Sequence, residues 1–326
     1  MSCDRVRRAR PLLGTLVEIT LAGQAESKLH EAADAAFAEI ARIHELMSVH
    51  SKESDLYRVN NAAVGSAVPV DTRTWQVLNL AAEISGESNG VFDVTVGAAM
   101  MARGALPRMV NGLPDRQATY RDIELLPGDC VRLQRELAID LGGIAKGYAV
   151  DRAVCILRKH GVPAGCVNAG GDLRAFGDEV QTVHVRDPLE PAIARAEVKL
   201  RNRALATSAN YAGSRGFDSS GVVLDPRDKR GVVAGRSASV RAEDCAVADA
   251  LAKCVLLTGT TSALLLRRFG AQGFLIEEGL PSIIGAEEDG GVLSARALET
   301  VAGRFDGAYT NRQSGAMIGN RPGACS

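Results

Sequence analysis

The residue types best suited to chemistry gather in the stretch DLGGIAKGYAVD, residues 140–151. This stretch follows an apolar run and leads into helical spacing, so backbone N–H groups and the positive end of a helix would face a bound anion. Gly142 and Gly143 would admit an anion close to the main chain, and Lys146 adds a full positive charge. Taken alone, the stretch fits an anion site and fits equally a plain glycine turn with a solvent-exposed lysine.

The two common phosphate-binding loops do not match this stretch. A P-loop needs lysine after glycine and before serine or threonine, whereas here Lys146 precedes a glycine. The GxGxxG spacing of dinucleotide-binding Rossmann domains is also missing at this point. An anion held here would therefore be bound in another way.

A second glycine pair lies in NAGGDLRAFG, residues 168–177, where it precedes the carboxylate of Asp172. Glycine pairs allow a ligand to approach the backbone closely. Two such elements in one chain predict a shared ligand, although two ordinary turns would read the same way.

The elements that must position these groups follow from hydrophobic periodicity. Alternating residues predict a strand at 15–21, and three- and four-residue spacing predicts a helix from Ser27 to about Met47. Asp71 is a plausible N-cap for a helix that ends near Gly86, and Gly161 is expected to end the helix after the glycine–lysine stretch. The remaining expected elements are a strand or hairpin at 131–143, short strands at 166–168, 183–185, 198–200, 222–224 and 273–276, and helices around 251–255 and 264–269.

This order mixes hairpins with single helices, which favours an α+β fold over a doubly wound sheet. Residues 1–301 are expected to form a single domain, either as one body or as two subdomains around one cleft. Residues 302–326 are short of aliphatic side chains and rich in glycine, so a flexible tail is predicted there.

Composition excludes several classes of protein. Lysine and arginine (38) balance aspartate and glutamate (39) without a long basic run, so no nucleic-acid partner is expected. The longest apolar stretches fall short of the roughly 20 residues that a membrane span needs, and no signal-peptide pattern is evident, so a cytoplasmic protein is predicted. Arg7 and Arg8 leave a twin-arginine signal as the weaker alternative. The seven cysteines show no CxxC pair and read as buried thiols in a reducing compartment.

Taken in order, the motifs of this chain resemble those of the ApbE family of FAD:protein FMN transferases. The matching stretches are LGT (13–15), MSVHSKESDLYRVN (47–60), GVFDVTVG (90–97), DLGGIAKGYAVD (140–151), NAGGDL (168–173), VRDP (185–188), ATSANY (206–211), LDP (224–226) and ADAL (248–251). The resemblance implies mostly antiparallel mixed sheets with flanking helices. It also implies a Mg²⁺-dependent enzyme that binds FAD, passes FMN to a threonine or serine hydroxyl of a target protein, and releases AMP.

The resemblance further implies roles for individual residues. The metal ion would be held by the main-chain carbonyl of Ala145 and by Asp249, while Asp225 and Lys146 are the candidate catalytic groups. The residues expected to contact FAD are Ser48, Leu56, Asn60, Asp93, Gly142, Gly143, Lys146, Asp151, Asn168, Gly170, Gly171, Asp172, Thr207 and Ser208.

Two positions depart from the family pattern. Lys253 stands where the family usually has a threonine four residues after the ADAL aspartate, and Val222 stands where it usually has a histidine. Either Lys253 replaces part of the metal's charge, or it forms a surface pair with Asp249. Asp225 is then the nearest candidate base, and a turn-capping role for it is an equal alternative.

These departures keep two further functions open, namely a catalytically silent flavin-binding protein and an FAD pyrophosphatase that uses water. Of the five histidines, only His50 lies in a segment expected near FAD. The stretch SGAM, residues 314–317, resembles the Ser-Gly-Ala-Thr acceptor sequence of flavinylated proteins, but Met317 has no hydroxyl, so self-modification there is not expected.

Overall fold

The structure is a computed structural model of the chain, and it describes residues 4–210, 223–232, 235–285 and 293–294. Its main element is an eight-stranded sheet in the order β1-β2-β6-β7-β10-β11-β12-β13, with antiparallel pairing between neighbours. Its strands are β1 (Arg5–Leu12), β2 (Thr15–Ala22), β6 (Ala164–Ala169), β7 (Asp172–Phe176), β10 (Ala204–Asn210), β11 (Arg236–Ala242), β12 (Gln272–Glu277) and β13 (Leu280–Ile284).

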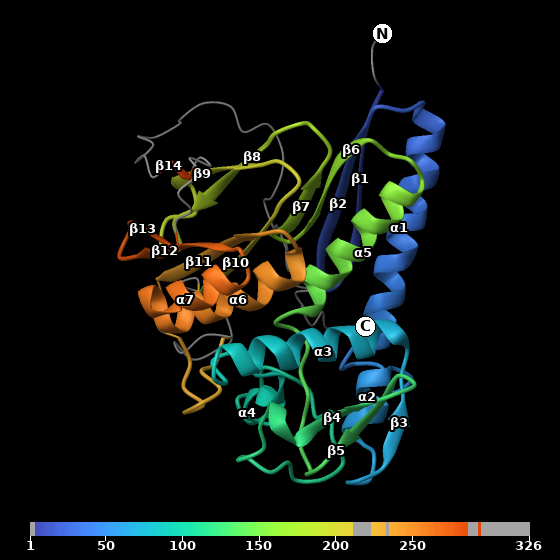
Figure 1. Ribbon diagram of the computed structural model, residues 1–326, viewed down its shortest axis with the longest axis vertical. Coiled ribbons are helices and arrows are strands. Elements are labelled where there is room, and N and C mark those ends of the chain that lie inside the picture. The colour runs from blue at the N-terminus through green and yellow to red at the C-terminus, as the bar shows by residue number, and fades with distance from the viewer. Residues whose placement is uncertain (1–3, 211–222, 233–234, 286–292, 295–326) are drawn as a thin grey trace, which may run out of the picture.

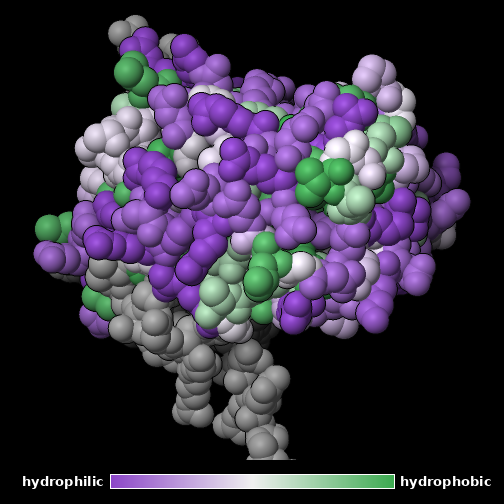
Figure 2. Space-filling view, turned by 90° about the horizontal axis from the view of Figure 1, so that it is seen from below, coloured by the Kyte–Doolittle hydropathy of each residue, from purple (hydrophilic) through white to green (hydrophobic). Residues whose placement is uncertain are grey.

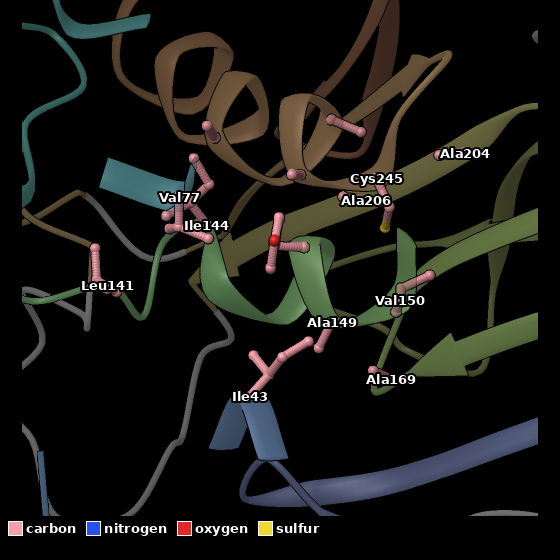
Figure 3. Packing of buried hydrophobic residues seen from close by; sticks show 14 of the residues in the cluster. Ile43, Val77, Leu141, Ile144, Ala149, Val150, Ala169, Ala204, Ala206 and Cys245 are labelled. Carbon is pink, nitrogen blue, oxygen red and sulfur yellow. The ribbon is translucent and has the colours of Figure 1, made fainter. Parts of the chain in front are cut away.

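Three helices lie side by side across one face of this sheet (Figure 1). They are α1 (Glu26–Met47), α5 (Ala145–Lys159) and α6 (Cys245–Thr258), and they cover β1 and β2, β6 and β7, and β10 and β11 in that order. Figure 3 shows how tightly α5 sits in the middle, with Ala149 facing Ile43 of α1 and Ile144 beside Val77 of α3 (Thr72–Glu87). All four of these side chains are fully buried, so the start of α5 is fixed by core packing.

The opposite face of the main sheet carries a smaller sheet of β8 (Gln181–Arg186), β9 (Ala194–Leu200) and β14 (Leu293–Ser294). A separate hydrophobic cluster joins the two, with Leu173 and Phe274 from the large sheet against Val185 and Val198 from the small one. The main sheet is therefore buried on both faces over its central strands.

A smaller lobe lies below the three helices (Figure 1). The third sheet, in the order β3-β5-β4, belongs to it. Its elements are α2 (Asp55–Asn60), β3 (Ala67–Pro69), α3, η1 (Val94–Val96), α4 (Gly97–Ala102), η2 (Tyr120–Asp122), β4 (Ile123–Leu126) and β5 (Cys130–Leu133). Seen from this side, the surface is mainly hydrophilic, and hydrophobic residues form separate groups instead of one continuous patch (Figure 2).

One buried carboxylate ties the lobe to the helical layer. Glu39 of α1 accepts two hydrogen bonds from Arg73 of α3, at 2.9 and 3.0 Å, and one from Arg152 of α5, at 3.1 Å. The hydrogen bonds from Arg73 and then from Arg152 hold the pKa of Glu39 below its usual value, although burial opposes them. Three helices are thus fixed to one another at a single charged junction.

The α+β fold and the antiparallel sheets are confirmed. The expected helices at 27–47, 71–86 and up to Gly161 match α1, α3 and α5 to within about two residues, the usual uncertainty of helix ends. Asp71 accepts a hydrogen bond from the backbone of Arg73 as an N-cap, and Gly161 has a positive φ of 73° directly after α5. The expected strands at 15–21, 166–168, 183–185, 198–200 and 273–276 match β2, β6, β8, β9 and β12.

The prediction of a strand or hairpin across 131–143 is wrong beyond Leu133. The backbone beyond it pairs with separate partners, since Ile139 bonds the side chain of Asn60, Asp140 donates to Val94, and the carbonyl of Ala138 accepts from Gly97. A buried apolar run reads like a strand whether or not a ladder is present, which explains the error.

Other expectations fall partly or wholly outside the described residues. Of the strand expected at 222–224, only an isolated bridge between Leu224 and Gly231 is seen, and Val222 lies outside the described residues. The 302–326 tail and the SGAM stretch also lie outside them.

One helical run, Cys245–Arg268, is long and apolar enough to cross a membrane by length and composition alone. In the structure this run is broken at Gly259 by the short helix η3 (Gly259–Ser262), which precedes α7 (Ala263–Arg268). Its first part, α6, packs against β10, β11 and α5 and carries the fully buried Asp249. Within the described chain α6 is therefore a core helix, whereas only Leu266 of α7 is buried.

Candidate functional site

The start of α5 and the start of α6 touch each other, and a glycine permits the contact. A Cβ added at Gly147 would lie 2.3 Å from the carbonyl oxygen of Cys245 and 2.8 Å from Cα of Ala246. No larger residue fits there without moving backbone. Gly147 is the residue that sequence reasoning missed, because nothing in the letters GYA indicates a neighbouring helix.

Because the two helices are so close, an aspartate of each helix caps the N-terminus of the other. Asp249 of α6 accepts a hydrogen bond at 3.2 Å from the backbone N–H of Gly147, in the first turn of α5. Asp151 of α5 accepts two at 2.9 Å from the backbone N–H groups of Cys245 and Ala246, in the first turn of α6. Carboxylates at helix N-termini are stabilising because free N–H groups and the helix dipole both favour negative charge. The N-terminus of α5 is thus already capped by a negatively charged side chain of the protein, that of Asp249.

A line of alternating charges runs through this junction. The ammonium of Lys146 contacts the carboxylate of Asp172, and the ammonium of Lys253 contacts that of Asp249. Asp172 and Asp249 are almost fully buried, whereas the side chain of Lys146 is 34% exposed. Burial alone would lower the pKa of Lys146, but the charges of Asp249 and Asp172 outweigh it and raise that pKa. The two carboxylates therefore favour the charged form of Lys146, which lies partly exposed beside them.

The second glycine pair forms the tight turn that places Asp172. Gly170 and Gly171, with φ of 66° and 106°, make a two-residue hairpin between β6 and β7, which requires positive φ at both positions. A Cβ on Gly170 would also lie 2.4 Å from Oγ1 of Thr15. Asn168 closes the turn by accepting from the N–H of Gly171 at 2.9 Å. Asp172 follows at once and faces α5.

The loop in front of α5 is held from the small lobe. Asn60 exchanges two hydrogen bonds with the backbone of Ile139, at 2.8 and 3.0 Å. Asp93 accepts from the N–H and hydroxyl of Thr95 and from the N–H of Tyr120. Both side chains are buried. Asn60 bonds the segment before α5 directly, whereas Asp93 orders the neighbouring segment, whose Val94 carbonyl accepts from the N–H of Asp140.

The two glycines of this loop lie at the cluster. Gly142 donates its N–H to the carboxylate of Asp140 at 2.9 Å and is exposed. A Cβ on Gly143 would lie 3.3 Å from the ring of Phe92 and 3.7 Å from Cε of Lys253. Gly143 thus lies beside Lys253, and the second glycine turn reaches the same group of charges through Asp172.

Asp151 also lies on α5, four residues after Gly147. Besides capping α6 it accepts from Arg174 at 2.7 Å, and Arg174 also bonds Asp244 at 2.7 Å. Burial raises the pKa of Asp151 to about 6, although Arg174 and the two backbone N–H groups oppose the shift. A shallow cavity of about 330 Å³ opens here, lined by α5 and by Arg174 of β7. In this structure Asp151 serves the junction between the two helices.

The remaining candidates have structural partners of their own. Ser48 accepts from the N–H of His50 at the end of α1, and Leu56 is a core side chain. Thr207 shares a 2.7 Å hydrogen bond with Ser239 of the neighbouring strand, and Ser208 is buried. Any contact that these residues make with FAD stays a prediction.

Asp225 is not placed as a free base. Arg227 binds both of its carboxylate oxygens, at 2.9 and 2.6 Å, within one turn. These hydrogen bonds hold the pKa of Asp225 below its usual value against the effect of burial. A carboxylate that is fully engaged and weakly basic fits the turn-capping alternative better than proton abstraction.

The donor set does not fit the expected magnesium ion. Mg²⁺ requires near-octahedral oxygen donors, and the described residues contain no group of three or more His, Cys, Asp or Glu side chains that could hold a metal. Two ligands were expected. Asp249 already accepts from the Lys253 ammonium with one carboxylate oxygen and from the N–H of Gly147 with the other. The second, the main-chain carbonyl of Ala145, belongs to the first residue of α5. A cation of the protein stands at the carboxylate that the metal would use.

Comparison with known proteins agrees with this arrangement of motifs. The family model described as the ApbE family matches residues 13–273. A FAD:protein FMN transferase of Rhodobacter capsulatus is 28% identical over 92% of this chain and 59% of its own length, and one of Vibrio cholerae is 29% identical over 78% of this chain and 82% of its own. This chain thus spans less than two thirds of the first relative.

Solved structures show the same architecture. The ApbE protein of Thermotoga maritima superposes with a TM-score of 0.74 at 27% identity, covering 86% of this chain and 96% of that one. The flavinyl transferase ApbE of Pseudomonas stutzeri, at 21% identity, shares the fold with a TM-score of 0.73 over 88% of this chain and 99% of its own. With the motifs, the fold and the family model in agreement, the chain belongs to the ApbE family.

Proposed function

We propose that this chain transfers FMN from FAD to a threonine or serine hydroxyl of a target protein and releases AMP. The observation that carries the proposal is the cluster at the start of α5, where the partly exposed ammonium of Lys146 contacts Asp172, the residue directly after the Gly170–Gly171 turn. The relatives named as FAD:protein FMN transferases support the same activity.

The reaction breaks one phosphoanhydride bond of FAD. The acceptor hydroxyl oxygen forms a bond to the FMN phosphorus, the bond from that phosphorus to the bridging oxygen breaks, and AMP leaves with that oxygen. The hydroxyl proton passes to a base and the negative charge of the leaving AMP increases. Such transfers depend mainly on positioning and on neutralising charge.

Lys146 is the group best placed to neutralise that charge. The charges of Asp249 and Asp172 raise the pKa of Lys146 and so favour its charged form, and the contact with Asp172 holds it in place. Glycine at 142 and 143 adds no side chain of its own in front of α5, which allows a ligand to approach the main chain closely. The Mg²⁺ requirement implied by the family resemblance has no fitting donor set among the described residues, so no step is assigned to a metal. The cytoplasmic location stays a prediction.

A second candidate is a catalytically silent flavin-binding protein. The pairing of Asp225 with Arg227 favours it, because the nearest candidate base is then occupied. Hydrolysis of FAD with water as the acceptor is the third outcome that the same experiment separates.

The test is incubation with FAD and an acceptor protein that carries a Ser-Gly-Ala-Thr sequence. We expect AMP by chromatography and flavin on the acceptor by intact mass, and neither from a control acceptor whose threonine is replaced by valine. AMP with free FMN would instead support hydrolysis, and unchanged bound FAD would support the silent protein. The Lys146→Met variant should lose transfer.

A further inference from the structure

We infer that the Lys253 ammonium is a built-in counter-cation at Asp249, so that FAD binding by this chain needs no divalent metal ion. This inference rests on the proposed function, since it assigns the charge balance of the same FAD site. It goes beyond that function because it makes the site independent of metal.

The first support is the geometry at Asp249. Lys253 lies one turn after Asp249 on α6, and its Nζ contacts both Oδ1 and, at 2.9 Å, the main-chain oxygen of Asp249. The other carboxylate oxygen accepts from Gly147. Asp249 is completely buried, so its two oxygens have protein partners and no contact with solvent.

The second support is how the lysine itself is held. Its side chain is 16% exposed, and its Cε lies near Gly143, where a Cβ would be 3.7 Å away. The same Cβ would lie 3.3 Å from Phe92, so the glycine loop leaves the space that the lysine stem and the aromatic ring use. A surface pair would leave the lysine mostly in water, which is not the case here.

The third support is the sum of charges. Lys146 pairs with Asp172 and Lys253 pairs with Asp249, so the charge of Asp249 is already balanced without a metal ion. A divalent ion at Asp249 would have to displace Lys253 or lie beside its positive charge, and like charges at short range in a buried site repel strongly. The ammonium therefore takes the place that a metal ion would need.

The wild-type protein supplies the primary test. Its dissociation constant for FAD is measured by flavin fluorescence with EDTA and again with excess MgCl₂. We expect the two values to agree within about twofold, which is under 0.5 kcal/mol. We also expect no shift of the melting temperature on adding MgCl₂ without FAD, because no site is available for the ion.

Variants at Lys253 show whether the ammonium is responsible. Lys253→Thr removes the charge and adds a hydroxyl oxygen beside Asp249, so FAD binding in EDTA should weaken by at least about tenfold and MgCl₂ should restore it. Lys253→Met removes the charge but adds no oxygen donor, so MgCl₂ should restore less. Lys199→Thr, on an exposed position of β9, is the matched control and should bind FAD like the wild type.

The outcomes separate this inference from the proposed function. Loss of wild-type FAD binding in EDTA, with recovery in MgCl₂, would overturn the inference and leave FMN transfer intact. Unchanged FAD affinity of Lys253→Thr in EDTA would also overturn it. Absence of FAD binding under every condition would overturn the proposed function, and this inference with it.

Discussion

Replacement of Gly147 by alanine tests the contact on which the site is built. The added Cβ would lie 2.3 Å from the carbonyl oxygen of Cys245, and real Cβ contacts are essentially never shorter than 3.0 Å. The starts of α5 and α6 must therefore separate by about 0.7 Å, the difference of those two values. Because the contacts are with backbone atoms, no side-chain rotation relieves them.

The expected cost of Gly147→Ala follows from three effects. Overpacking costs about 1–3 kcal/mol, and a weakened hydrogen bond to the buried carboxylate of Asp249 costs up to about 1.5–3 kcal/mol. Alanine favours the helix by at most roughly 1 kcal/mol. We therefore expect the free energy of unfolding to fall by about 2–4 kcal/mol.

Urea unfolding followed by circular dichroism measures this change, and Gly86→Ala is the matched control. Gly86 lies near the end of α3 with nothing within 4 Å of an added Cβ. The same substitution there should raise the free energy of unfolding by about 0.5–1 kcal/mol. A Gly147→Ala protein as stable as the wild type would show that the two helices do not approach as described.

Three further substitutions test the parts that hold the site. Glu39→Gln should lower the free energy of unfolding by about 2–3 kcal/mol at neutral pH. Because the folded-state pKa of Glu39 is lowered, the difference from the wild type should shrink as the pH falls below 4.5, and a difference independent of pH in urea unfolding would contradict this. Asn60→Ala removes two hydrogen bonds to the loop before α5 and should lower the free energy of unfolding by about 1–3 kcal/mol and weaken FAD binding, which unfolding and fluorescence titrations check. Gly170→Ala should destabilise more than Gly171→Ala in thermal melts, because only at Gly170 does the new Cβ meet a side chain; equal losses would speak against the hairpin geometry.

Local patterns were sufficient where an element packs on one face. The three- and four-residue spacing at 27–47 predicted α1, and an N-cap and a terminal glycine predicted the ends of α3 and α5, because caps act within a few residues. The strand β1 was not predicted. Its arginines form hydrogen bonds with Glu18 and Asp34 of other elements. Because charged residues are frequent in this edge strand, its sequence lacks the apolar alternation by which a strand is recognised.

The strands β10 and β11 were missed as elements because alanine and serine dominate them, and these residues carry no β-branched signal. In the site, the glycine pairs drew attention to Lys146 and Asp172, and the family resemblance identified Asp249. Their mutual contacts depend on how α5, α6 and β7 pack, which no local pattern encodes. The mutual capping of α5 by Asp249 and of α6 by Asp151 could therefore be found only in the three-dimensional structure.

The central claim is that the cluster at the start of α5 grips the diphosphate of FAD through Lys146. The most direct measurement compares the affinities of the wild type and of Lys146→Met for FAD and for riboflavin, which lacks phosphate. The account predicts that FAD binds more tightly than riboflavin to the wild type, and that the substitution removes most of this preference while riboflavin binding changes little. A second variant, Lys146→Met with Asp172→Asn, keeps the charges balanced and should behave in the same way. An unchanged preference for FAD in a folded Lys146→Met protein would contradict the account.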